Sequence, residues 1–463
     1  MSKETSSAPA EAMPVYQSAE KIYPREMAGR YATFSRWSTI VLLGLFYLVP
    51  WLQYDERQAV LFDLPARKFY LLGLTLWPQD FPFLALLLII AAISLFFFTA
   101  LLGRVWCGFA CPQTVWTEAF IWMEQWTEGT RSQRMKLDKA PLSWNKFRRK
   151  FSKQFLWITF SLWTGYTFVG YFTPIREYGV ELINLQVGGW ALFWTLFYGF
   201  ATYGNAGYMR EQVCKYMCPY ARFQSAMFDK DTLIISYDES RGEPRGSRKR
   251  GVDYQAKGLG DCIDCTLCVQ VCPTGIDIRD GLQYECIACG ACVDACNSVM
   301  DKMNYPRGLV RYTTEHAVTG EKTRIIRPRV IVYASLLTIL VGSLVTAVAL
   351  RTPVILDVLR DRNALYRELP SDLIENTYTI KLINQSNETR EFVLTVDGLP
   401  GLELAGIPET ILVEGGGVKS MPVRARMPRS EIRGSREIAF KATATDNPDI
   451  SRVAESRFVG PIG

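Results

Sequence analysis

The chain has 463 residues, of which 49% are hydrophobic and 13% aromatic, and its formal net charge at pH 7 is +6. Length alone allows two or three domains, but several uncharged runs of about 20 residues are long enough to cross a hydrocarbon core and predict a membrane protein. The excess of positive charge lies mostly in loops that flank these runs, so it requires no nucleic-acid partner.

The N-terminal segment, residues 1–36, is expected to be disordered, because its first 20 residues are polar and contain no apolar core of a signal peptide. Five uncharged runs then predict five membrane-spanning helices, at Trp37–Gln53, Phe81–Leu102, Gln154–Thr173, Gln186–Tyr203 and Val330–Leu350. A shorter apolar run, residues 69–77, is expected at the outer membrane surface or as a re-entrant piece.

The distribution of Lys and Arg predicts the orientation in the membrane. There are five in residues 1–36, ten in residues 103–153 and eighteen in residues 205–329, against three in residues 54–80 and one in residues 174–185. The cytoplasmic loops of membrane proteins are the ones rich in Lys and Arg. We therefore expect a cytoplasmic N-terminus, with residues 351–463 outside. The basic run Arg241–Arg250 is interpreted as a solvated loop, with docking of an acidic electron donor as the weaker alternative.

All twelve cysteines fall into four clusters, and none lies in the outer region, where disulfides would be permitted. Residues 262–273 read CIDCTLCVQVCP and residues 286–296 read CIACGACVDAC. Each is the C-x2-C-x2-C-x3-C run of bacterial two-cluster ferredoxins, in which the fourth cysteine ligates the other cluster.

These runs predict a cytoplasmic dicluster ferredoxin domain over residues 229–329. One [4Fe-4S] cluster is assigned to Cys262, Cys265, Cys268 and Cys296, and the second to Cys286, Cys289, Cys292 and Cys272. Two zinc sites are the alternative, but two identical quartets fit the paired spacing of zinc ligands poorly.

The other four cysteines form a repeated CxxxCP motif, WCGFACP at residues 106–112 and VCKYMCP at residues 213–219. The matching cysteines are 107 residues apart in both pairs, which indicates a duplication within a four-span membrane domain at residues 37–228. Cysteines four apart would share one face of a helix, and the proline is expected to start a new helix. The segments 116–126 and 220–228 are expected to be helices in the inner membrane interface.

Brought together, Cys107, Cys111, Cys214 and Cys218 would form a four-thiolate site. Soft thiolates select Cu(I), zinc or iron-sulfur, and copper is favoured here, with Met209 and Met217 as auxiliary ligands. A third iron-sulfur centre, or cysteines that merely pack, are the alternatives. The single histidine, His316, excludes a bis-His haem within the membrane and imidazole-type metal sites.

Beyond the fifth span, at residues 330–350, the pattern changes to short alternating runs. They lie at residues 378–382, 391–396, 418–427 and 437–444 and predict an antiparallel, immunoglobulin-like sandwich over residues 351–463. This domain contains no Cys or His and is interpreted as an interaction module.

The order of these parts, over residues 20–460, resembles the CcoG family, also called FixG or RdxA, the cytochrome c oxidase accessory proteins. The resemblance implies a multi-pass protein of the bacterial inner membrane, with a helical bundle, an inserted ferredoxin-like domain and a periplasmic immunoglobulin-like domain. It further implies a cupric reductase that makes Cu(I) for assembly of cbb-type cytochrome c oxidase, with the four CxxxCP cysteines as the catalytic, copper-handling thiols.

The partners implied are membrane lipid, a cytoplasmic electron donor, a copper chaperone or copper-exporting ATPase, and the oxidase or its assembly factors, without nucleic acid. Two other hypotheses stay open: a copper-free electron-transfer subunit of a quinone-linked respiratory chain, and a non-enzymatic assembly or redox-sensing scaffold. The sequence does not identify the electron donor, the copper acceptor or the oligomeric state.

Overall fold

The computed structural model describes residues 21–54, 57–254, 256–361, 364–370, 372–386 and 388–461. The chain forms two compact units, whose boundaries fall inside the long helices. The first unit comprises Met1–Gly44, Leu95–Gly165 and Leu196–Ile331, and the second comprises Leu45–Ser94, Tyr166–Thr195 and Val332–Gly463. Of the segment predicted to be disordered, residues 1–20 lie outside the described residues. For residues 21–36 the prediction is wrong, because α1 begins at Arg30 and the Arg25 N–H donates to the carbonyl of Gln270.

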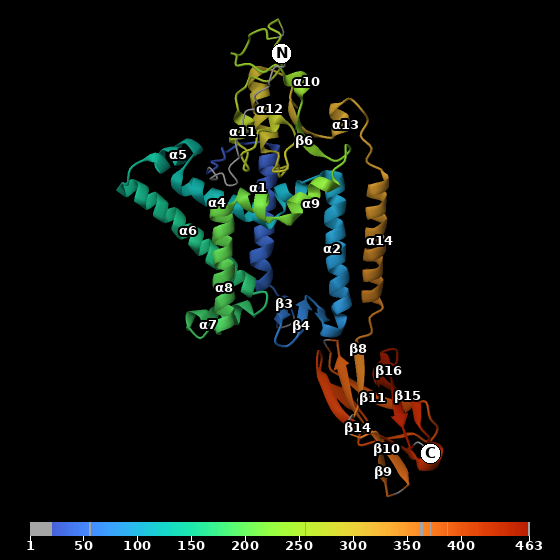
Figure 1. Ribbon diagram of the computed structural model, residues 1–463. Helices are drawn as coiled ribbons and strands as arrows, with labels where there is room; N and C mark the ends of the chain where they lie inside the picture. Colours follow the sequence, from blue (N-terminus) through green and yellow to red (C-terminus); the bar gives the residue numbers. More distant parts are fainter. Residues whose placement is uncertain are drawn as a thin grey trace, which may run out of the picture. The chain divides into compact units, whose positions relative to one another are not determined.

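Among the described residues, three helices are long and apolar enough to cross a membrane: Arg30–Trp51, Pro78–Leu102 and Pro328–Ala349. They contain α1 (Arg30–Leu48), α2 (Phe81–Leu102) and α14 (Pro328–Ala349) (Figure 1). No residue of α14 is buried, and the exposed side chains include Ile339 and Val345. An apolar helix of this length whose side chains are largely exposed is suited to lipid.

The prediction of five spans is confirmed only in part. The third and fourth predicted runs are helical, but α6 (Trp144–Val169) begins with a cluster of five Lys and Arg residues. Helix α8 (Gly189–Thr202) has 14 residues before it changes into the π-helical segment η3 (Tyr203–Met209). A span needs about 20 apolar residues. The apolar part of each of these two helices is shorter than that.

The first unit combines short helices with a ferredoxin-like region. The short helical elements are α3 (Val105–Phe109), α4 (Pro112–Glu128), α5 (Arg131–Lys139), η4 (Val213–Met217) and α9 (Pro219–Met227). The ferredoxin-like region contains β6 (Ile234–Tyr237), α10 (Glu239–Gly242), α11 (Leu267–Gln270), η5 (Ile278–Asp280), α12 (Ala291–Met303), β7 (Val310–Thr313) and α13 (Glu315–Val318). Strands β6 and β7 pair antiparallel, with Ile234 opposite Thr313. Ile235 of β6 packs in a buried core together with Val293 and Met300 of α12.

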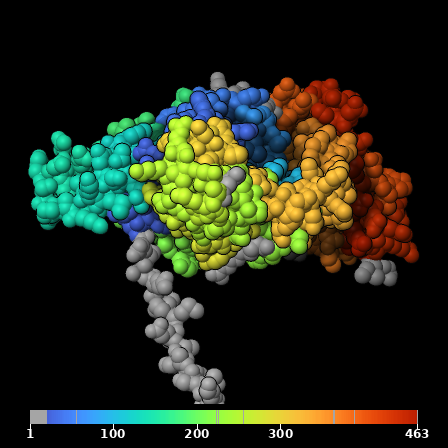
Figure 2. All heavy atoms as spheres, turned by 90° about the horizontal axis from the view of Figure 1, so that it is seen from above, coloured from blue at the N-terminus to red at the C-terminus, as the bar shows by residue number. Residues whose placement is uncertain are grey.

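The basic run Arg241–Arg250 belongs to a loop on the surface of this region, drawn yellow-green in Figure 2. Arg241 pairs with Asp261, and Arg248 donates to the carbonyls of Gly246 and Gly260. Arg245 also pairs with Glu243, and Arg250 donates to Asn304 Oδ1. Four of the five cations therefore have partners within the domain, which favours the interpretation as a surface loop over a docking site.

The second unit begins with short strands: β1 (Gln53–Tyr54), β2 (Arg57–Gln58), β3 (Val60–Asp63), β4 (Lys68–Leu71) and β5 (Leu74–Leu76). The apolar run 69–77 lies in β4 and β5, which form an antiparallel hairpin beside β3. Between the third and fourth predicted spans lies α7 (Ile175–Ile183), whose Tyr178 is fully buried and stacks on Tyr166.

The C-terminal part of the second unit is a β-sandwich, as predicted. Its strands are β8 (Val354–Arg360), β9 (Arg367–Leu369), β10 (Leu373–Asn384), β11 (Arg390–Asp397), β12 (Glu403–Ala405), β13 (Ile411–Val413), β14 (Val418–Pro428), β15 (Ser435–Ala444) and β16 (Ser451–Val459). One sheet has the order β12-β14-β10-β8, with β9 also beside β10, and the other β13-β11-β15-β16. Side chains such as Phe392, Phe440 and Phe458 fill the core between them. The four predicted strand runs lie in β10, β11, β14 and β15.

Candidate functional site

The two cysteine loops of the ferredoxin-like region share one backbone conformation. Asp264 and Thr266 in the first loop have φ values of 52° and 54°, and Ala288 and Gly290, each 24 residues later, have 54° and 75°. A positive φ is uncommon for residues other than glycine. Such turns can direct successive N–H groups into a concavity that binds anions, including iron-sulfur clusters. The repeated conformation therefore indicates two equivalent anion-binding loops.

Each loop encloses a cavity lined by four of the predicted ligands. The first cavity is lined by Cys262, Cys265, Cys268 and Cys296. The second is lined by Cys272, Cys286, Cys289 and Cys292, together with Cys268. The structure thus brings together each predicted quartet, with three cysteines from one loop and the fourth from the other run.

The surroundings of these thiols fit a thiolate-ligated cluster. Burial raises the pKa of Cys286 to about 11, while the backbone N–H of Ala288, donated to the sulfur, opposes the rise. Burial likewise raises the pKa of Cys268 to about 11, and the nearby Arg279 guanidinium opposes it. Positive charge and N–H donors of this kind stabilise anionic sulfur.

Among the described residues, no three His, Cys, Asp or Glu side chains converge where one metal ion would bind. A single zinc ion needs its ligands at about 2.0–2.3 Å, whereas a [4Fe-4S] cluster holds each thiolate on a different iron. Each predicted quartet of cysteines lines one cavity, and four thiolates are the number that one [4Fe-4S] cluster takes.

The two CxxxCP motifs also have matching local structures. Cys107 lies in α3 and Cys214 in η4, whereas Cys111 and Cys218 are the residues that immediately precede α4 and α9. Each following helix begins at the proline, as expected, because proline needs no hydrogen bond there. The expectation that both cysteines of a motif share one helical face is wrong, since Cys111 and Cys218 have extended backbones.

The four motif thiols gather in the first unit. Burial raises the pKa of Cys107 to about 12, and Cys111 and Cys214 are near enough to add to the rise. Burial also raises the pKa of Cys214 to about 11, with contributions from Cys111 and Cys218. The Cys107 thiol donates to Oε1 of Gln224, a residue of α9, at 3.4 Å. Thiols of both motifs are therefore near one another, although no three of them converge on the position of a single ion in the described part of the chain. Met209 and Met217 are 36% and 56% exposed.

The first motif packs directly against the second ferredoxin loop. A Cβ added at Gly108 would lie 2.8 Å from the carbonyl oxygens of both Ile287 and Ala288. Arg104, which is 5% exposed, donates to the carbonyl of Cys286 at 3.1 Å and to that of Ala221 at 2.8 Å. Gly108 thus packs the first motif on this loop, and Arg104 links the loop to α9, the helix that follows the second motif.

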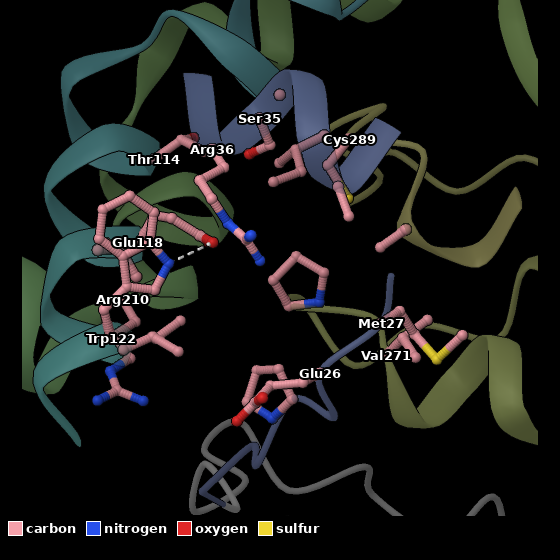
Figure 3. A pocket seen from close by; sticks show the side chains of 18 of the residues that line it. Glu26, Met27, Ser35, Arg36, Thr114, Glu118, Trp122, Arg210, Val271 and Cys289 are labelled. Carbon is pink, nitrogen blue, oxygen red and sulfur yellow. Dashed lines mark hydrogen bonds between the residues drawn. The ribbon is translucent and has the colours of Figure 1, made fainter. Parts of the chain in front are cut away.

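A cavity of about 820 Å³ lies beside this junction and is lined by Cys214 and Cys289. Figure 3 shows Glu118 and Trp122 of α4 on one wall, Cys289 on the other, and Arg36 of α1 pointing between them. Trp122 Nε1 donates to Glu118 Oε1 at 3.1 Å.

The sequence reasoning missed several charged residues that hold this site. Glu124 of α4 is fully buried and pairs with Arg210 at 2.9 Å and with Arg134 at 3.1 Å. Arg210 lies between η3 and η4 with a φ of 38°. The available signal was the presence of two carboxylates, Glu118 and Glu124, in the mainly apolar segment 116–126.

Three family models match the chain. They are a 4Fe-4S dicluster domain at residues 209–315, a 4Fe-4S binding domain at residues 84–131, and the Ig-like fold at the C-terminal of FixG at residues 344–461. The first two models include all twelve cysteines, so the repeated CxxxCP motifs also fall within iron-sulfur models.

Curated relatives match most of the chain. Protein RdxB of Cereibacter sphaeroides is 40% identical over 86% of this chain and 87% of its own. Protein RdxA of the same organism is 40% identical over 89% of this chain and 88% of its own. The nitrogen fixation protein FixG of Rhizobium meliloti is 35% identical over 94% of this chain and 91% of its own.

Proposed function

Because the chain belongs to the FixG/RdxA family and is an iron-sulfur electron-transfer protein, we propose that it is a membrane cupric reductase. Electrons delivered to the ferredoxin-like region would reduce Cu(II) at the four CxxxCP thiols. The observation that carries this proposal is the contact of Gly108, inside the first motif, with the Ile287–Ala288 loop.

The two quartets of cysteines are the proposed cluster ligands, because each lines one cavity. Bound there, a [4Fe-4S] cluster supplies a one-electron couple whose potential depends on burial and on hydrogen bonds to sulfur. The chain contributes these hydrogen bonds through backbone N–H groups such as that of Ala288. It also excludes water with apolar side chains such as Val299 and Met300.

The exposure of the thiols gives the proposed path a direction. Cys265 is exposed, whereas Cys262, Cys268 and Cys286 are buried. A soluble electron donor would therefore approach the loop that carries Cys265. The other loop, with Cys286 and Cys289, is the one that contacts the CxxxCP region.

At the four thiols, one electron converts Cu(II) to Cu(I), which prefers soft sulfur ligands. The proposed acceptors are a copper chaperone or a copper-exporting ATPase, and the proposed purpose is assembly of a cbb-type oxidase. In this proposal the ferredoxin-like region faces the cytoplasm of a bacterial inner membrane, because the loop 205–329 that contains it holds eighteen Lys and Arg residues, against three in residues 54–80 and one in residues 174–185. The sandwich then faces the periplasm, where it can dock assembly partners.

A second candidate is favoured by a specific observation. The 4Fe-4S binding model at residues 84–131 includes Cys107 and Cys111. The four thiols would then hold a third cluster, and the protein would be a copper-free electron-transfer subunit. Thiolates suit both outcomes.

Metal analysis separates the two candidates. Iron and copper per chain are measured on anaerobically purified protein and on a variant with Cys107, Cys111, Cys214 and Cys218 all changed to Ser. The copper proposal expects about eight iron atoms per chain in both proteins, the content of two clusters, with copper bound only by the unmodified protein. A loss of iron in the variant would instead support the third cluster.

A further inference from the structure

The cavity of about 820 Å³ between α1, α4 and the second cysteine loop is not used by the function proposed above. Its volume lies within the range of small-molecule sites, about 300–1,000 Å³. It is lined by apolar side chains such as Ile40, Ile121 and Trp122, and also by six charged residues: Arg25, Glu26, Arg36, Glu118, Arg210 and Glu211. Apolar walls with charged groups between them suit an organic molecule that has an apolar body and polar atoms for hydrogen bonding.

We propose that this cavity binds a quinol, which donates electrons to the protein through the loop that carries Cys289. The inference rests on the proposed function and adds to it a second entry point for electrons: a lipid-soluble donor at the Cys289 loop, besides the soluble donor at the Cys265 loop. It rests on three observations. One side of the cavity is formed by the loop that carries Cys289, another side is formed by the candidate span Arg30–Trp51, and Arg36 and Glu118 point into the cavity.

The first wall gives the ligand a redox partner. Cys289 and Ile287 of the second loop line the cavity, and Cys214 of the second CxxxCP motif lines it as well. A molecule in the cavity would therefore lie against both groups of thiols. A ligand in this position is placed to exchange electrons.

The second wall gives access from the membrane. Ser35, Arg36 and Ile40 line the cavity and belong to the candidate span Arg30–Trp51. Trp126 of α4 also lines the cavity and is 76% exposed, and Trp is enriched where a protein meets the membrane interface. A lipid-soluble donor would reach such a site more readily than a water-soluble one.

The polar groups in the cavity can form hydrogen bonds with both the carbonyl of a quinone and the hydroxyl of a quinol. Arg36 is a hydrogen-bond donor for a quinone carbonyl, and the Glu118 carboxylate is an acceptor for a quinol hydroxyl, both pointing into the cavity in Figure 3. Trp122 fixes the Glu118 carboxylate by its hydrogen bond at 3.1 Å. Burial raises the pKa of Glu118, with Trp122 and Arg36 opposing the rise, which makes it a better proton acceptor.

The chemistry favours a quinol over a nicotinamide. A nicotinamide transfers a hydride, two electrons at once, and requires a two-electron acceptor such as a flavin. A quinol releases its electrons singly, through a semiquinone. One quinol therefore gives one quinone, two electrons and two protons. The electrons leave through the Cys289 loop and convert two Cu(II) to two Cu(I), while one proton passes to Glu118 and the other to water.

The test uses the full chain with its clusters, in lipid nanodiscs under anaerobic conditions, and decylubiquinone as the probe. Binding of the oxidised probe is measured by calorimetry, and the reduced probe is tested for bleaching of the visible iron-sulfur absorbance. Ser35→Phe fills the cavity and should weaken binding by at least roughly tenfold. Thr33→Phe, on the same helix at an exposed position outside the cavity lining, should bind as the unmodified protein does.

Glu118→Gln separates proton transfer from binding. It should retain most of the binding but slow bleaching by the reduced probe by roughly 100-fold, the contribution of a positioned base. Bleaching by dithionite should be unchanged. Absence of saturable binding, equal binding by Ser35→Phe, or displacement of the probe by phospholipid alone would overturn the proposal.

The same experiment distinguishes this inference from the proposed function. If dithionite-reduced protein makes Cu(I) but decylubiquinone does not bind, the quinol site is wrong and the copper function stands. If the reduced probe bleaches the clusters but no Cu(I) forms, the quinol site stands and the copper function is wrong.

Discussion

Replacement of Gly108 by Ala tests whether the first CxxxCP motif is packed on the second cysteine loop. The added Cβ would lie 2.8 Å from two backbone carbonyl oxygens, and an ordinary contact begins at 3.4 Å, so the two segments must separate by about 0.6 Å. Neither carbonyl is a flexible side-chain end that can turn away. Gly108 lies within α3 and has no positive φ, so Ala itself is tolerated by the backbone.

Overpacking of this kind costs about 1–3 kcal/mol. For a unit of this size, that loss lowers the apparent Tm by roughly 2 to 10 °C. Thermal loss of the iron-sulfur absorbance, at one fixed heating rate, measures the effect. The rate of electron transfer from reduced clusters to added Cu(II) should fall as well.

Gly44→Ala is the matched control, because a Cβ at Gly44 in α1 would meet no atom within 4 Å. It should leave the Tm unchanged or raise it slightly, because Ala favours a helix over Gly by up to about 1 kcal/mol. If Gly108→Ala were as stable as Gly44→Ala and transferred electrons at the same rate, the packed junction would be refuted.

Three further predictions concern the site and its supports. Cys296→Ser should remove the cluster of the loop 262–268 and not that of its own run, so that iron per chain falls from about eight to about four. Glu124→Gln should destabilise the first unit by about 3–5 kcal/mol, because it leaves Arg210 buried without its charge partner. Although burial opposes ionisation, Arg210 and neighbouring Lys side chains hold the pKa of Glu124 at about 2, below its unfolded value of about 4.3. The Tm of the unmodified protein should therefore fall as the pH drops from about 4.3 to about 2, a dependence that Glu124→Gln should lack. Asp294→Ala should cost about 1 kcal/mol, because Asp294 accepts the N–H of Ala32 at 2.8 Å, and hydrogen exchange in the first turn of α1 should become faster.

Local chemistry made much of the fold predictable. The ferredoxin spacing predicted which cysteines line each cavity, because loop length and ligand order are encoded within about ten residues. The alternation of β10 and β14 predicted the sandwich, because one face of each strand is buried. The prolines after Cys111 and Cys218 predicted the starts of α4 and α9.

The remaining features depend on contacts between distant segments. The sequence does not show that Gly108 touches Ala288, 180 residues later, or that Arg104 donates to the loop carbonyl of Cys286. The uncharged run 186–203 predicted a full span, but its α-helical part has only 14 residues, Gly189–Thr202, and π geometry follows from Tyr203. That change accompanies the positive φ at Arg210, which is held by Glu124, 86 residues earlier in the chain.

The most direct test of the central claim is a single-turnover experiment. Protein with fully reduced clusters, freed from reductant, is mixed anaerobically with excess Cu(II), and Cu(I) is counted with a Cu(I)-specific chelator. The account predicts about two Cu(I) per chain, one electron from each of two clusters, and almost none from the variant lacking the four CxxxCP thiols, although its iron content is unchanged. Equal Cu(I) formation by the variant with intact clusters would show that these thiols are not the site of copper reduction.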